Sequence, residues 1–328
     1  MLLCAPSWFG LFSLDSKYWI RVANDRVRFA LFLKLAQAFR FRTPCIISTM
    51  ASSRRPQLGR PKIGVFDSGV GGLTVLRALV DRIPEADYLY FGDTARLPYG
   101  SKSAATVAHY AVGAVRYLQE QGAELLVIAC NTATALALDE IKSAAGAEVI
   151  GVIEPGAEAA AAASRKRRVV VIGTDATISS HAYRRALEAR KVAVREKACP
   201  LFVPLVEEGW VEHPVTEQVA RIYLSEAFSD DASDADVLVL GCTHYPLIKP
   251  LLRRVAPDHI AIVDSAESTA QDVVRQLQVG TLPSTKSERR SPPRLRFFAT
   301  DSAEKFRKMG TRFLGLPVED VVHVDLKE

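Results

Sequence analysis

Two cysteines in this 328-residue chain stand in nearly the same local setting. Cys130 follows the apolar run 125–129, and Cys242 follows the run 237–240 and one glycine. An acidic residue precedes each run, and hydroxyl or amide residues come after each cysteine. A helix that begins there would stabilise a thiolate through its free N–H groups, as an acid/base or nucleophilic cysteine requires. A single buried cysteine is more often a small apolar side chain, but the repeated setting favours chemistry.

Two aspartates, Asp67 and Asp93, end further apolar runs at 63–66 and 88–91. Continuous apolar runs that alternate with helical patterns predict parallel strands covered by helices on both faces. Ligands of such sheets bind beyond the carboxyl ends of the strands. The two aspartates and the two cysteines are therefore candidate site residues.

The glycine-rich run DSGVGG at 67–72 follows the first of these strands. It matches neither the dinucleotide-binding pattern nor the P-loop pattern. We expect its backbone N–H groups, at the start of a helix, to suit a small anion such as a carboxylate.

The same alternation continues along the chain and restarts once. In the first part we expect a helix that begins at 73, a helix over 103–121, a helix that follows Cys130 and ends at 143, and a strand over 149–153 stopped by Pro155 and Gly156. After the restart we expect a strand over 168–173, a polar turn over 174–180, a helix over 181–191 and a segment that continues over 245–254. The remaining elements are a turn and helix over 264–277, a loop over 283–293, a strand over 295–300 and a helix over 303–316. The similar segments around Cys130 and Cys242 indicate a weak internal duplication.

The expected fold class is α/β, with two similar, doubly wound parallel-sheet domains in a pseudo-twofold relation. We expect the active site in the cleft between them. The domain prediction is an N-terminal extension over 1–60, a first domain over 61–155 plus 264–328, and a second domain over 156–263.

Composition and charge exclude several classes of protein. Hydrophobic residues make up 48% and charged residues 24%, as in soluble globular proteins. Residues 1–49 hold seven Lys or Arg and two Asp, which accounts for the whole net charge of +5. The rest is formally neutral, so we expect no nucleic-acid partner. No apolar run reaches the 18 residues of a membrane span.

The cysteine spacing argues against disulfides and metal sites. Five cysteines with no CxxC pair fit a reduced, cytoplasmic protein. Cys242 and His244 have no second ligand pair at zinc spacing, so we expect no metal. Cys199, which precedes Pro200, is interpreted as structural.

From about residue 63 onward the chain resembles the glutamate racemases, a family of cofactor-independent amino-acid racemases. The resemblance rests on five segments over roughly 250 residues, and they are IGVFDSGVGGLTVL (63–76), YFGDTARLPYG (90–100), IACNTATA (128–135), CPLFVPLVEEG (199–209) and LGCTHYPL (240–247).

The resemblance implies inversion at the α-carbon of glutamate without pyridoxal phosphate, metal or nucleotide. Cys130 and Cys242 would be the two bases, with Cys242 removing the proton from L-glutamate and Cys130 donating to the opposite face. Asp67 would assist Cys130, and Glu207 and His244 would assist Cys242. The substrate-binding residues implied are Asp67, Ser68, Tyr99, Gly100, Asn131, Thr132, Thr243 and His244.

The resemblance also implies a role in the cell and an assembly. The enzyme would supply D-glutamate for bacterial peptidoglycan in the cytoplasm, as a homodimer. Two alternatives stay open. One is a sister racemase that acts on aspartate or a hydantoin, and the other is a non-catalytic binding role on the same fold.

The first fifty residues differ from the rest of the chain. They are rich in aromatic and basic residues, with an amphipathic basic stretch over 26–42. This composition fits an organellar transit peptide better than a secretory signal. The interpretation we favour is a mis-assigned start, with translation beginning at Met50, and a disordered extension is the alternative.

A start at Met50 predicts the mass of the natural product. Intact-mass spectrometry of protein expressed from its own start region should show a chain that begins near Met50. A full-length mass would exclude this interpretation.

Overall fold

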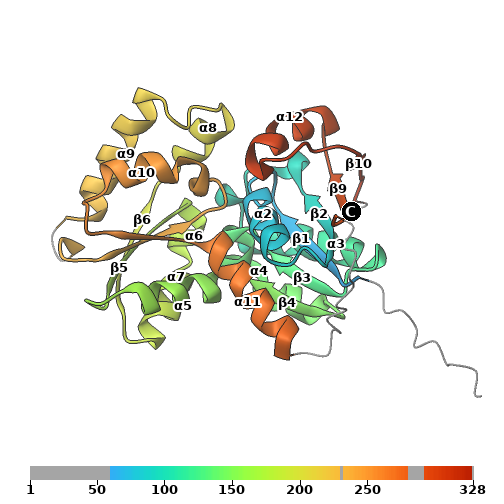
Figure 1. Cartoon of the computed structure of the whole chain (residues 1–328), viewed down its shortest axis with the longest axis horizontal. Helices are drawn as coiled ribbons and strands as arrows, with labels where there is room; N and C mark the ends of the chain where they lie inside the picture. The colour runs from blue at the N-terminus through green and yellow to red at the C-terminus, as the bar shows by residue number, and fades with distance from the viewer. Residues whose placement is uncertain (1–59, 230–231, 280–291, 327–328) are drawn as a thin grey trace, which may run out of the picture. The chain divides into compact units, whose positions relative to one another are not determined.

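Two parallel β-sheets organise the part of the chain that the computed structural model describes, which is residues 60–229, 232–279 and 292–326 (Figure 1). One sheet has six strands and the other has four. The expected N-terminal extension and most of the expected loop over 283–293 lie outside the described residues. The expected α/β class with parallel sheets is confirmed.

The six-stranded sheet has the order β10-β9-β2-β1-β3-β4, and all of its strands are parallel. Its strands are β1 (Lys62–Asp67), β2 (Asp87–Gly92), β3 (Leu125–Ile128), β4 (Glu148–Gly151), β9 (Leu295–Ala299) and β10 (Val321–His323). The associated helices are α2 (Leu73–Arg82), α3 (Ala104–Glu120), α4 (Asn131–Ala144), α11 (Ser265–Val279) and α12 (Ala303–Leu314).

Both faces of this sheet are covered at its centre, which is why the central strands β1 and β3 are buried along nearly their whole length without alternation. Successive strand residues point to opposite faces. Val65 therefore packs into the core shared with α2 and α12, while Phe66 packs into the core shared with α3 and α4.

The four-stranded sheet has the order β6-β5-β7-β8 and is also parallel. Its strands are β5 (Arg168–Gly173), β6 (Ala193–Ala198), β7 (Val237–Gly241) and β8 (Ala261–Asp264). Around it lie α5 (Ile153–Ala163), α6 (Asp175–Ser179), α7 (Ala182–Ala189), α8 (Phe202–Glu207), α9 (Pro214–Ala227) and α10 (Lys249–Val255). Short 3-10 helices cover Thr94–Arg96, Tyr99–Ser101 and Tyr245–Ile248.

The two sheets repeat one topology. β2-β1-β3-β4 and β6-β5-β7-β8 have the same spatial order relative to the chain, so β3 and β7 occupy equivalent places. The chain reverses its winding direction beside β1 in one sheet and beside β5 in the other, and such switch points are where open α/β sheets bind ligands. The internal duplication that the two cysteine segments indicate is thus present in the topology.

Strand register brings the candidate residues to these switch points. In the first sheet Phe66 pairs with Ile128, so Asp67 and Cys130 leave neighbouring strands at nearly the same level. In the second, Gly173 pairs with Gly241, which sets Thr174 beside Cys242. The predicted domain boundaries stay a prediction, because residues 57–328 group as one compact unit.

Two local predictions are wrong. Residues 174–180 contain the short helix α6 instead of a polar turn, because the hydroxyl of Thr174 caps it by accepting from the backbone N–H of Thr177. Pro155 and Gly156 do not stop a strand. β4 ends at Gly151, and both residues lie in the first turn of α5, where proline needs no N–H partner.

Strand β6 has no clear signal in the sequence. β6 reads AVREKA, is only partly buried and lies at a sheet edge, so it lacks the apolar run of the central strands.

Among the described residues, no helix is both long and apolar enough to cross a membrane.

Gly71 should be intolerant of a side chain. A Cβ atom there would lie 2.3 Å from Thr243 Oγ1 and 2.5 Å from His244 Nδ1. We expect Gly71→Ala to lower the free energy of unfolding by about 1–3 kcal/mol through overpacking. Denaturant unfolding with circular dichroism measures this change.

The matched control is Gly113→Ala within α3, where the nearest heavy atom lies 3.8 Å from the added Cβ. It should raise stability by about 0.5–1 kcal/mol, since alanine favours the helix. Equal stability of Gly71→Ala and the unsubstituted protein would contradict the packing described here.

Candidate active site

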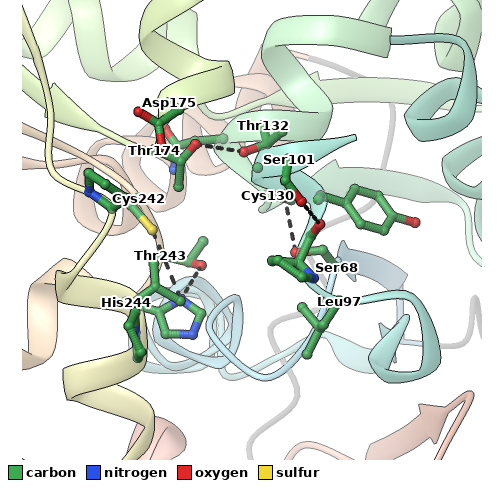
Figure 2. A pocket seen from close by; sticks show the side chains of 17 residues that line it. Ser68, Leu97, Ser101, Cys130, Thr132, Thr174, Asp175, Cys242, Thr243 and His244 are labelled. Carbon is green, nitrogen blue, oxygen red and sulfur yellow. Dashed lines mark hydrogen bonds between the residues drawn. The ribbon is translucent and has the colours of Figure 1, made fainter. Parts of the chain in front are cut away.

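A cavity of about 240 Å³ opens where the carboxyl ends of strands from both sheets converge (Figure 2). The predicted site residues that line it are Ser68, Tyr99, Gly100, Cys130, Asn131, Thr132, Cys242, Thr243 and His244. Asp67 and Glu207 do not line it, and each lies behind a residue that does.

Cys130 occupies the junction of β3 and α4. Its Sγ caps the helix by accepting from the N–H of Ala133 at 3.4 Å, and it donates to Ser68 Oγ at 3.5 Å. Burial, followed by the negative charge of Asp67, raises the pKa of Cys130 to about 12. The helix N-terminus therefore does not outweigh desolvation, and Cys130 is a neutral thiol at neutral pH.

Asp67 lies beneath Cys130 and is almost fully buried. Burial raises the pKa of its carboxyl group, although backbone N–H groups of Gly72, Gly69 and Ser68 and the positive charge of His244 oppose the rise. The N–H of Gly69 donates to Oδ2 at 3.0 Å, while Oδ1 is buried without a hydrogen-bond partner.

These contacts correct the prediction for the glycine-rich run. Its N–H groups bind a carboxylate, but that carboxylate is the side chain of Asp67 and not a ligand. A Cβ on Gly72 would lie 2.5 Å from the Cβ of Asp67, so the turn closes directly on this side chain.

Cys242 has a different electrostatic environment. It follows β7 and precedes the 3-10 helix Tyr245–Ile248, so the expected α-helix start is absent here. Its Sγ lies 4.0 Å from His244 Nδ1, and His244 Nε2 lies 3.1 Å from Glu207 Oε1. One imidazole thus bridges the thiol group and a carboxylate.

His244 carries a positive charge at neutral pH. Burial lowers the pKa of its imidazole, but the hydrogen bonds to Cys242 and Glu207 outweigh burial and raise it to about 10. Burial likewise raises the pKa of Glu207, and the bond to His244 more than compensates and lowers it overall. Cys242 Sγ therefore lies beside a positively charged ring, whereas Cys130 Sγ lies near a buried carboxyl group.

The two cysteines face the cavity from opposite sides. Figure 2 shows Cys242, Thr243 and His244 along one wall, and Cys130 with Ser68 along the other. One wall belongs to the four-stranded sheet and the other to the six-stranded sheet. A group held between them would meet a thiol on one face and a sulfur beside an imidazolium on the other.

Three hydroxyl groups connect the two sheets at the cavity. Thr132 Oγ1, at the start of α4, lies 3.0 Å from Thr174 Oγ1 and 3.3 Å from Thr177 Oγ1. A fourth hydroxyl group, that of Thr74 in α2, also joins the two sheets by donating to the backbone oxygen of Thr243 at 3.0 Å. These bonds fix the spacing of the two walls.

Two predicted substrate ligands are already engaged within the protein. The Tyr99 hydroxyl donates to Asp93 Oδ2 at 2.7 Å. The Asn131 side chain accepts from Tyr183 at 2.8 Å and donates to Ser265 at 3.4 Å. Both residues line the cavity, so what they offer a ligand is their remaining surface and backbone.

Asp93 is a structural residue. It is fully buried and accepts hydrogen bonds from Tyr99, Arg96 and Thr300, which hold the loop over 93–101 against the first sheet. It does not line the cavity, although the strand-end rule made it a candidate.

Some residues that line the cavity were not predicted as site residues from the sequence. Thr174 and Asp175 follow β5 at its carboxyl end, so the rule that found the cysteines could have found them. Leu97, Pro200, Val203 and Pro204 supply apolar surface and carry no chemical signal. Within the described ranges, no cluster of three or more His, Cys, Asp or Glu is arranged to hold a metal ion.

Comparison with known proteins places this site in a family. Residues 63–273 match the Asp/Glu/Hydantoin racemase family. The glutamate racemase of Koribacter versatilis is 59% identical over 285 residues, which span 81% of this chain and 98% of that protein. The chain belongs to the Asp/Glu/Hydantoin racemase family. It is therefore an isomerase with the fold of the racemases.

Solved glutamate racemases share the fold. The Thermus thermophilus enzyme in complex with β-chloro-D-alanine is 45% identical with a TM-score of 0.73, over 81% of this chain and 98% of that chain. The Francisella tularensis enzyme in complex with D-glutamate is 37% identical with a TM-score of 0.74, over the same shares.

The electrostatic difference between the two cysteines predicts different reactivity. Their exposed fractions are nearly equal, at 5% for Cys130 and 6% for Cys242. At pH 8 iodoacetamide should alkylate Cys242 at least about ten times as fast as Cys130, because of the two cysteines only Cys242 lies beside an imidazolium. Peptide mass spectrometry gives both rates, with buried Cys199 as the slow internal control. Equal rates would contradict the charge assignment.

The raised pKa of His244 predicts a pH-dependent stability. The imidazolium stabilises the folded state fully below the unfolded pKa of about 6.5. This contribution is lost as the pH rises through the folded pKa of about 10. The stability difference between the unsubstituted protein and His244→Gln, measured by urea unfolding, should therefore shrink from pH 6.5 to pH 10. A difference that is constant over this range would refute the assignment.

Proposed function

We propose that this protein is a glutamate racemase that interconverts L- and D-glutamate by two-cysteine proton transfer. The observation that carries the proposal is the pair Cys130 and Cys242, which leave equivalent strands of two sheets and face one cavity from opposite sides. Inversion at a carbon requires a base on one face and an acid on the other. The duplicated topology supplies both.

The different surroundings of the two sulfurs suggest a direction for each cysteine. With L-glutamate bound, Cys242 acts as the thiolate beside the imidazolium of His244 and removes the α-proton. Cys130, a thiol in this state, donates its proton to the opposite face of the planar carbanion. The product is D-glutamate, and the two sulfurs have exchanged protonation states. The reverse reaction then begins from Cys130.

Asp67 supports the reverse reaction. Cys130 becomes a thiolate next to a carboxyl group whose pKa is itself raised by burial. Oδ1 of Asp67 is buried without a hydrogen-bond partner, so it has a free lone pair with which to accept a proton. We infer that Asp67 takes the thiol proton of Cys130 when D-glutamate is bound, so that Asp67 becomes a neutral carboxylic acid as Cys130 becomes the thiolate.

Neutral donors bind most of the substrate. None of the residues that line the cavity is Lys or Arg, so the carboxylates of glutamate meet hydroxyl and backbone N–H groups and the imidazolium of His244. Ser68, Thr132 and Thr243 offer hydroxyl groups, and Gly100 and Asn131 offer backbone N–H groups. The complex of the Francisella tularensis relative with D-glutamate supports a ligand of this size and charge.

The cellular role follows from the product. We propose that D-glutamate from this enzyme enters bacterial peptidoglycan, that the enzyme is cytoplasmic and that it forms a homodimer. We also propose two α/β domains, residues 61–155 with 264–328 and residues 156–263, which meet at the cavity.

Racemisation in D2O tests the mechanism. Proton NMR of L-glutamate with the purified protein and no added cofactor should show loss of the α-proton signal, and chiral chromatography should show D-glutamate. Cys130→Ser and Cys242→Ser should each lower racemisation by about 10²–10⁴-fold, because each removes one proton-transfer group. Cys199→Ser, a buried cysteine outside the cavity, is the control.

Exchange without inversion tests the assignment of each cysteine. Cys130→Ser retains the base for L-glutamate, so it should wash deuterium into L-glutamate without forming the D-isomer. Cys242→Ser should do the same for D-glutamate only. Racemisation at the unsubstituted rate in either variant would exclude the two-cysteine mechanism. Activity with aspartate or a hydantoin but not glutamate would identify a sister racemase, and none with any of them would favour a binding role.

A further inference from the structure

Helix α12 contacts the helix that carries Glu207. In the sequence, α12 connects β9 to β10 of the six-stranded sheet, whereas α8 belongs to the part of the chain that forms the four-stranded sheet. Arg312 Nη1 donates to the backbone oxygens of Val206 at 3.4 Å and Glu207 at 3.2 Å. The last carbonyl groups of a helix lack partners within the helix. A cation there also complements the helix dipole.

The backbone after α8 is shaped to receive the Arg312 side chain. Gly209 has a φ of +84°, which a side chain would strain. A Cβ at this position would lie 2.7 Å from Arg312 Nη1. The guanidinium group thus packs against the backbone of Gly209.

Other residues of α12 reach the same pair of catalytic groups. The Phe313 ring meets the ring of His244 edge-on, with centroids 5.1 Å apart. The positive charge of Lys305 helps to lower the pKa of Glu207. No residue of α12 lines the cavity, so its contribution acts through Glu207 and His244 and not through the substrate.

We propose that Arg312 is a positioning residue that holds the carboxyl end of α8, so that Glu207 stays bonded to His244 and His244 stays beside Cys242. The proposal rests on the proposed function for its kinetic consequence only. Its structural content is the link from Arg312 through Glu207 to His244. Nothing in the substrate cavity depends on Arg312 directly.

The first experiment compares three variants of the full chain. Arg312→Ala removes both hydrogen bonds, and Arg312→Lys keeps the charge and can restore one of them. Arg307→Ala removes an exposed arginine from the same helix as the control. For L-glutamate we expect Arg312→Ala to lower kcat about tenfold with KM unchanged. Arg312→Lys should recover part of this loss, and Arg307→Ala should match the unsubstituted protein.

The second experiment reads the site without turnover. In Arg312→Ala, iodoacetamide should alkylate Cys242 more slowly at pH 8, while Cys130 reacts at its unsubstituted rate. The alkaline limb of the pH–rate profile should move to lower pH, because a loosened Glu207 no longer holds the proton on His244. The ionisable groups that act on this pair are Cys242, Asp67 and Lys305, and all three are retained.

The outcomes separate this proposal from the proposed function. Slower alkylation at Cys242 alone supports the positioning role, even if the protein does not racemise glutamate. Equal slowing at both cysteines, or kcat and alkylation rates equal to those of Arg307→Ala, would overturn it.

Discussion

A buried positive charge on His244 is the constraint on which the site depends. An imidazolium removed from water needs a hydrogen-bond partner at each ring nitrogen. Cys242 supplies one and Glu207 supplies the other. Glu207 lies on α8, 37 positions before His244, so its bond to His244 ties the segment after β7 to an earlier helix. Gly71 closes the remaining space beside the ring, so the first sheet also helps to hold it.

The two cysteines show how one fold position can support two chemical states. They follow equivalent strands and are almost equally buried. Their neighbours differ, since Cys130 faces a buried carboxyl group and Cys242 faces an imidazolium. Burial raises the pKa of Cys130 most, and the negative charge of Asp67 adds to this rise. The duplicated topology gives the geometry of opposed groups, and the neighbours of the two sulfurs make their surroundings unequal.

Local sequence patterns predicted the positions of the central strands and placed both cysteines at strand ends. This works because buried parallel strands are apolar throughout and polar residues follow their carboxyl ends. Edge strand β6 is polar, so it lacked this signal. The role of Asp67 as the occupant of the glycine turn, and the engagement of Tyr99 by Asp93, depend on side-chain directions that spacing does not encode. The contact of Arg312 with α8 joins residues more than 100 positions apart, so no local sequence pattern predicts it.

The sheet order has a consequence for synthesis of the protein. β2 pairs with β9 on one side, yet β9 lies at 295–299, after every strand of the four-stranded sheet. While the chain leaves the ribosome, β2 therefore remains an open sheet edge, and the surface that α12 covers stays uncovered. The candidate site residues are all present by His244, whereas β9 begins at residue 295 and α12 at residue 303. The contacts that α12 makes with α8 and with His244 can thus form only after the C-terminal part of the chain has been synthesised.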